Sequence, residues 1–159
     1  MYCLFLSTVH LSGRPYVCAL CSIRSLESVQ KLFTSRLPGL QFISYGDRLR
    51  ILKMPSLEMR RLRSDLILCY KILKGFVAGP PVNYGLTLCN RKSRGHNLKL
   101  AKEFAVAAAR RSFFSNRIID PWNALPKETV MLDSVLSFKR ALTHCNFSDY
   151  LKQGFDVVG

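Results

Sequence analysis

The hydrophobic residues between Ser56 and Gly75 recur every three or four positions, which is the spacing that lines one side of an α-helix. Ser56 is suited to cap the amino end of such a helix, and Gly75 is suited to the left-handed position after its last turn. We therefore predict a long helix here. Its core-facing stripe consists of Met59, Leu62, Leu66, Cys69, Tyr70, Ile72 and Leu73.

Two shorter helices are predicted before the long one. The first is capped by Ser25 and ends at Pro38-Gly39. Its inward stripe is expected to be Leu26, Val29, Phe33 and Leu37, with Lys31 and Arg36 facing outward. The second begins after Ser44 and carries Asp47 in its first turn, where the free N–H groups of a helix favour a carboxylate.

The chain changes character after Gly79-Pro80-Pro81. Glycines and alternating patches between residues 82 and 110 predict two or three short strands or irregular segments, and the alanine-rich stretch 104–111 is compatible with a strand or a helix. Residues 113–120 are predicted to be helical up to a break at Pro121, with Trp122 closing the core. A last helix is capped by Asp133 or Ser134 and points Val135, Phe138 and Leu142 inward.

These elements predict a mainly α fold, a small helical domain with a short basic β or irregular insertion at about residues 82–110. A length of 159 residues suits one domain. We assign it to residues 23–147, with an atypical segment at 1–22, disordered or a gene-model artefact, and a tail at 148–159. No signal peptide or membrane span is recognisable, so the expected location is intracellular, in the nucleus or the cytoplasm.

The net charge of +14 is concentrated in the middle of the chain. Residues 22–147 hold 22 basic and 8 acidic residues, a difference that equals the whole excess. Such an imbalance makes nucleic acid the first candidate partner, ahead of an anionic membrane surface, which we do not expect it to bind.

The cysteines offer one further motif. Cys18 and Cys21 have the spacing of half a zinc site, but no second pair follows at a regular distance. Reduced, unpaired thiols are the preferred interpretation, and zinc binding remains open. No cofactor is predicted.

Six blocks in a fixed order carry a family resemblance: SLESVQKLFTSRLPGL, SYGDRLRIL, SLEMRRLRSDLILCYKILKG, SRGHNLKL, FFSNRIIDPWNALPKE and SVLSFKRAL. Together they span about residues 25–142. This order resembles the C-terminal region of non-LTR, LINE-type retrotransposon polyproteins of the jockey-like and chicken-repeat-like clades, downstream of the reverse-transcriptase palm. The stretch before Ser25 does not resemble that family.

The resemblance implies a piece of an RNA-directed DNA polymerase, but the residues for polymerisation are not recognisable. That chemistry needs two adjacent aspartates and a third nearby to hold two Mg²⁺ ions. The nearest look-alike is Tyr45-Gly46-Asp47-Arg48, where a cation replaces the second carboxylate and Asp47 is better explained as a first-turn acid. His96 and His144 are interpreted as surface or hydrogen-bonding residues. We predict no catalytic residue and no enzymatic activity.

Binding is the remaining function. The candidate contacts to RNA or a template-primer duplex, with little sequence preference, are Arg60, Arg61, Arg63, Arg91, Lys92, Arg94, Lys99, Lys102, Arg110, Arg111 and Arg117. Phe113 and Phe114 are interpreted as core residues, with stacking on unpaired bases as the alternative. Two other hypotheses stay open: a helical docking module for the polymerase thumb or another protein, and a relic reading frame without a selected role.

Overall fold

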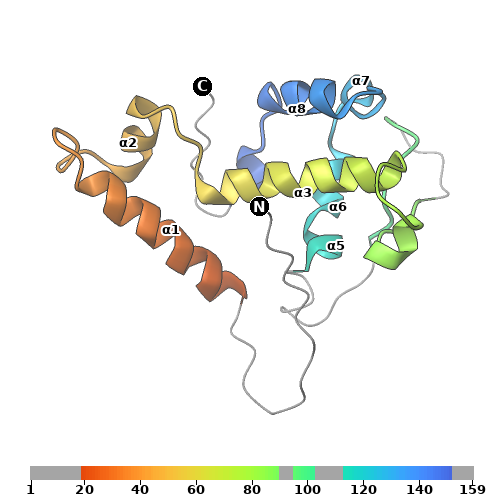
Figure 1. Ribbon diagram of the computed structural model, residues 1–159, viewed down its shortest axis with the longest axis horizontal. Coiled ribbons are helices and arrows are strands. Elements are labelled where there is room, and N and C mark those ends of the chain that lie inside the picture. The colour runs from red at the N-terminus through yellow and green to blue at the C-terminus, as the bar shows by residue number, and fades with distance from the viewer. Residues whose placement is uncertain (1–18, 90–94, 103–112, 152–159) are drawn as a thin grey trace, which may run out of the picture.

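The protein is described by a computed structural model that covers residues 19–89, 95–102 and 113–151, with side chains from residue 27 onward (Figure 1). The prediction of a mainly α fold is confirmed. The α-helices described are α1 Ala19–Ser35, α2 Tyr45–Ile51, α3 Leu57–Leu73, α5 Phe114–Arg117, α6 Ile119–Asn123, α7 Lys127–Val130 and α8 Val135–Thr143, and the 3₁₀ turns are η1 Pro81–Tyr84 and η2 Ser148–Tyr150. None of the described helices is long and apolar enough to cross a membrane.

Helix α3 is the centre of the molecule and confirms the prediction made for it. The Ser56 hydroxyl accepts a hydrogen bond from the Met59 N–H at 3.1 Å, and Gly75 has a φ of +76° just after the last turn. Leu66 and Cys69 are fully buried in the predicted stripe. The main core cluster collects around this stripe.

Helix α8 lies along one side of α3, and α5 and α6 lie on the other (Figure 1). The Tyr70 and Phe138 rings stack with their centroids 4.2 Å apart, and the Tyr70 hydroxyl donates to the Leu132 carbonyl. Trp122 is fully buried in the same cluster, as predicted. Leu151 also joins it, so the core extends into the segment that follows residue 147.

The insertion after α3 is irregular, and the described residues contain no strand. A single antiparallel bridge joins Leu88 to Leu100. Side-chain hydrogen bonds also hold residues 98–100 against α6. The Asn123 side chain exchanges two hydrogen bonds with the Leu100 backbone, at 2.8 and 2.9 Å. The Trp122 indole N–H donates to the Leu98 carbonyl at 2.7 Å. The alanine-rich stretch 104–111 lies outside the described residues.

The prediction for α2 is confirmed. The predicted first helix is present as α1, with Lys31 and Arg36 exposed as expected, but the predictions of its start and of its buried side are wrong. The Ser44 hydroxyl accepts the Asp47 N–H at 3.3 Å, which caps α2. Helix α1 begins at Ala19 rather than after Ser25, and its polar side is the buried one. Val29 and Phe33, expected in the core, are exposed, because Glu27 on the opposite side is tied to Tyr45 and to the start of α3. The side chain of Leu26 lies outside the described set.

The predicted break at Pro121 is also wrong, since Pro121 lies inside α6. Proline is tolerated there because the first-turn N–H groups of a helix have no partner within the helix. The helix predicted from Ser134 is confirmed: the Ser134 hydroxyl accepts the Leu136 N–H at 3.2 Å, and Phe138 and Leu142 are buried.

Candidate nucleic-acid interface

The structure describes about half of the basic residues predicted to contact nucleic acid. It includes Arg60, Arg61, Arg63, Lys99, Lys102 and Arg117. Outside the described residues lie Arg91, Lys92, Arg94, Arg110 and Arg111.

The three arginines of α3 lie in three different surroundings. Arg60 is exposed and lies close to Tyr45. Burial raises the pKa of Tyr45, and the positive charge of Arg60 opposes part of this increase. Arg61 lies near Arg117. Arg63 lies near Cys145, where its positive charge opposes the rise that burial causes in the pKa of the thiol. Arg61 is turned by about 100° from Arg60 and by about 160° from Arg63, whereas Arg60 and Arg63 lie within about 60° of each other. Helix α3 therefore does not present these cations as one basic face.

Arg117 is held in an ion pair rather than presented to solvent. Its Nε and Nη2 atoms donate to the two carboxylate oxygens of Asp65 at 2.7 and 2.8 Å. Asp65 is buried, so this two-point contact supplies the partner that a desolvated carboxylate needs. Burial lowers the pKa of Arg61, and the nearby Arg117 charge lowers it further, while Asp65 opposes both. The structure thus joins α5 to α3 through Arg117.

The two lysines of the insertion also have local partners. The Lys102 ammonium lies 2.6 Å from the Asp120 carboxylate, and both side chains are exposed. Lys99 lies beside His96 and helps to lower its pKa, although burial is the larger cause. An exposed ion pair is weak, so Lys102 remains able to exchange Asp120 for another anion.

Phe113 does not follow the preferred interpretation of the sequence, which placed it in the core. Its ring is 64% exposed, whereas Phe114 packs against the core cluster. The core interpretation is therefore right for Phe114 and wrong for Phe113. The Arg117 N–H donates to the Phe113 carbonyl at 3.0 Å, so the exposed ring stands one helical turn before Arg117. Its position at the amino end of a four-residue helix leaves it little core to pack against.

Several exposed cations have no ion pair among the described residues. They include Lys31, Arg36, Lys53, Arg60, Lys127, Lys139 and Arg140, and of these only Arg60 is among the contacts proposed from the sequence. Four aspartates are already occupied by Arg50, Lys74, Lys102 and Arg117. The described surface therefore keeps an unneutralised positive excess on several elements.

Metal binding finds no support in the described residues. They contain no group of three His, Cys, Asp or Glu side chains that would hold a metal ion. Asp47 is engaged by the Ser44 hydroxyl at 2.5 Å and by Arg50 at 2.8 Å. The Cys18 and Cys21 side chains, the proposed half zinc site, lie outside the described set.

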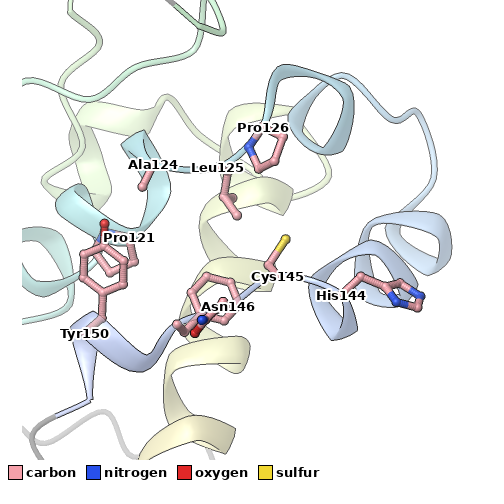
Figure 2. Close-up of a pocket in the computed structure, with 9 residues that line it drawn as sticks. Pro121, Ala124, Leu125, Pro126, His144, Cys145, Asn146 and Tyr150 are labelled. Atoms are coloured by element: carbon pink, nitrogen blue, oxygen red, sulfur yellow. The ribbon is translucent and has the colours of Figure 1, made fainter. Parts of the chain in front are cut away.

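A shallow pocket of about 280 Å³ lies between α6–α7 and the segment after α8 (Figure 2). Pro121, Leu125, Cys145 and Tyr150 are among its lining residues. Burial raises the pKa of Cys145, and the thiol donates to the Ala141 carbonyl at 3.5 Å. In Figure 2 the His144 ring points away from the Cys145 sulfur. This pair is not arranged for nucleophilic chemistry.

Comparison of the whole chain with protein-family models, with curated proteins and with solved structures finds no match.

Proposed function

We propose that the chain is a non-catalytic part of a LINE-type RNA-directed DNA polymerase and that it binds RNA or template-primer nucleic acid with little sequence preference. The six ordered blocks between residues 25 and 142 support the retrotransposon origin. The charge distribution supports the binding. Phosphate contacts position a protein on nucleic acid without reading its sequence, so a surface built on charge discriminates weakly between sequences.

The observation that carries this proposal is the positive excess that the acidic residues leave unneutralised. Asp47, Asp65, Asp120 and Asp133 each lie within 4 Å of a cation, and Glu27 is buried. Exposed lysines and arginines on α1, α3, α7 and α8 have no ion pair among the described residues. Such a field attracts a polyanion and releases its condensed counterions on binding.

Phe113 is the proposed point of base contact. An exposed aromatic ring next to cations suits an unpaired base, because every base has a face on which a ring can stack. Arg110 and Arg111 are separated from Phe113 in the sequence by Ser112 alone and are proposed to hold the adjoining phosphates. We assign Arg117 a different role, the joining of α5 to α3.

Fluorescence anisotropy with a short single-stranded RNA across a salt series tests this function. The log of the affinity falls by about 0.7 per neutralised phosphate for each log unit of salt, so four to six contacts give a slope of about −3 to −4. Reversing charge at Arg110 and Arg111 together is expected to flatten the slope by about two contacts. Phe113→Ala is expected to weaken binding by about tenfold at every salt concentration, because one stacked base is lost.

Matched controls separate a local site from diffuse charge. Leu136→Ala removes another exposed apolar side chain, and Lys139→Glu with Arg140→Glu removes two other exposed cations. Both controls are expected to change RNA binding less than their counterparts. Equal flattening by both charge reversals, together with no effect of Phe113→Ala, would refute the proposed site. A salt-independent affinity would refute binding through charge altogether.

The docking-module hypothesis is favoured by a separate observation, the exposed apolar side of α1.

A further inference from the structure

Arg48 of helix α2 is a buried cation without an anionic partner. It is 4% exposed, yet no described carboxylate lies within 4 Å of its guanidinium. Its Nε atom is enclosed without a hydrogen-bond partner, and no hydrogen bond from a described residue engages its two outer nitrogens. The guanidinium carbon lies 5.7 Å from the centroid of the Tyr45 ring. A ring face attracts a cation but does not satisfy its N–H donors, so the guanidinium lacks the partner that burial demands.

A second cation lies near Arg48, at the start of α3. The Glu27 carboxylate joins α2 to α3, because its two oxygens accept the Tyr45 hydroxyl at 2.5 Å and the Leu57 N–H at 3.1 Å. Burial raises the pKa of Tyr45, and the charges of Arg48 and Arg60 both oppose this rise, so both cations lie near this ring. Arg60 is exposed and has no ion pair among the described residues. Two cations around one engaged acid leave one positive charge uncompensated.

The chemistry of this place suits a phosphate group. The outer edge of a guanidinium donates two parallel hydrogen bonds to an oxyanion, and the outer nitrogens of Arg48 are not enclosed as its Nε is. Each phosphate of a nucleic-acid backbone carries one negative charge, which equals the local excess. Lys53, just after α2, is also exposed and has no ion pair among the described residues, so the surrounding field favours a polyanion.

We propose that Arg48 and Arg60 form a binding site for one phosphate group at the junction of α2 and α3. Such a group belongs to an RNA backbone or is a free phosphate ion, and with RNA the inference rests on the proposed function. Arg48 was not among the contacts proposed from the sequence. The site lies on other elements than Phe113, which precedes α5, so the two are separable by mutation.

Thermal unfolding of the full chain in inorganic phosphate, compared with chloride at equal ionic strength, tests the site directly. Phosphate at about ten times its Kd is expected to raise the Tm by about 2 to 5 °C. Arg48→Met should lose most of this rise. In chloride the variant should be at least as stable as the parent, because a buried cation without a partner has been removed. An arginine that served only the fold would instead lower the Tm in both buffers when replaced.

Fluorescence anisotropy with single-stranded RNA across a salt series then identifies the source of the phosphate. Arg48→Met and Arg60→Gln are each expected to flatten the salt slope by about one contact and to weaken binding about three- to tenfold. Arg50→Met is the matched control, because Arg50 lies on the same helix but is exposed and paired with Asp47 at 2.8 Å. This control should keep the phosphate-induced rise in Tm and change the RNA slope less than Arg48→Met.

The remaining outcomes each decide the proposal. No rise of the Tm in phosphate, or a rise that Arg48→Met retains, overturns the site even if the Arg110 and Arg111 reversal still flattens the RNA slope. A rise that Arg48→Met abolishes supports the site. With an unchanged RNA slope in that variant, or with no RNA binding at all, the ligand is then free phosphate, and the second case refutes the proposed function alone. Equal, non-additive losses of Tm in chloride from Arg48→Met and Asp156→Asn would make the Asp156 carboxylate the partner and overturn the proposal.

Discussion

At the scale of single residues, the buried charges depend on their partners. Asp65 is 8% exposed and is held by two hydrogen bonds from Arg117, whereas Asp47 and Arg50 form a similar pair in open solvent. A desolvated carboxylate that loses its partner keeps the cost of burial, but an exposed one is rehydrated by water. The same kind of contact therefore has different energetic weight at the two places.

Arg117→Ala is expected to lower the free energy of unfolding by about 2 to 3 kcal/mol, somewhat less than for a fully buried ion pair, because the arginine is partly exposed. Arg50→Ala, which removes the exposed pair, is expected to cost about 0.5 kcal/mol or less. Urea denaturation of both variants measures the difference. Similar losses in the two variants would mean that Asp65 is solvated.

His96 is the second residue whose environment has a measurable consequence. It is 2% exposed, and its Nε2 atom lies 3.2 Å from the Trp122 carbonyl. A carbonyl only accepts, so Nε2 carries the hydrogen, and the buried Nδ1 has no partner among the described residues. Burial lowers the pKa of His96, and Lys99 lowers it further. The neutral ring is the form that fits the fold.

We therefore expect acid to destabilise the protein through this residue. Below a pH of about 6.5 the unfolded chain takes up a proton that folded His96 does not, so stability is full above pH 7, falls as the pH drops through about 6.5, and levels off below the folded pKa. Between pH 7.5 and 5.5 the loss is at most about 1.4 kcal/mol. His96→Gln should reduce this loss in urea titrations followed by circular dichroism. His144→Gln, at an exposed histidine, should retain it.

At the scale of helices, α3 and α1 show what periodicity determines. In α3 the periodic stripe is apolar and buried, and the cap residues mark both ends. In α1 the periodicity groups Val29 and Phe33 correctly on one side, but that side is exposed. A period says which residues share a side of a helix. Which side is buried depends here on Tyr45 and Leu57, residues 18 and 30 positions away from Glu27, and no local pattern contains them.

Leu66→Ala in α3 is expected to cost about 2 to 5 kcal/mol of stability, because the side chain is fully buried and its removal leaves a cavity. Leu68→Ala, two positions later, is expected to cost less than about 1 kcal/mol, since Leu68 is 40% exposed. Thermal unfolding monitored by circular dichroism compares the pair. Equal costs would reverse our assignment of the inner and outer sides of α3.

The candidate site was predictable in composition but not in geometry. The basic excess is plain in the sequence, and a rotation of about 100° per residue already separates Arg61 from Arg60 and Arg63. The pairing of Arg117 with Asp65 joins residues 52 positions apart, so the sequence alone left Arg117 among the candidate contacts. For Phe113 the error ran the other way. Its aromatic side chain predicted a core position, but it stands before a short helix and is exposed.

At the scale of the whole molecule, most described aspartates are paired while many cations are not, so the charge imbalance reaches across several elements. The proposed polyanion surface depends on this imbalance, whereas a site for two metal ions would need converging carboxylates. Asp47 lies with Ser44 and Arg50 in a helix cap.

Purified protein supplied with Mg²⁺, a primed RNA template and deoxynucleotides is therefore expected to produce no primer extension above a blank reaction. Denaturing gel electrophoresis of a labelled primer is the measurement. A product that disappears in the Asp47→Ala variant would contradict the non-catalytic assignment. Retention of RNA binding in that variant is the control for folding.

The packing of Trp122 gives the molecule an internal optical reporter. It is the single tryptophan of the sequence, it is fully buried, and the His96 ring meets it edge-on with centroids 5.9 Å apart. An indole shielded from water emits at shorter wavelengths than a hydrated one, and a protonated imidazole in contact with it quenches the emission. Intrinsic fluorescence will therefore register the release of residues 96–100 from α6 as a red shift and the protonation of His96 as dimming.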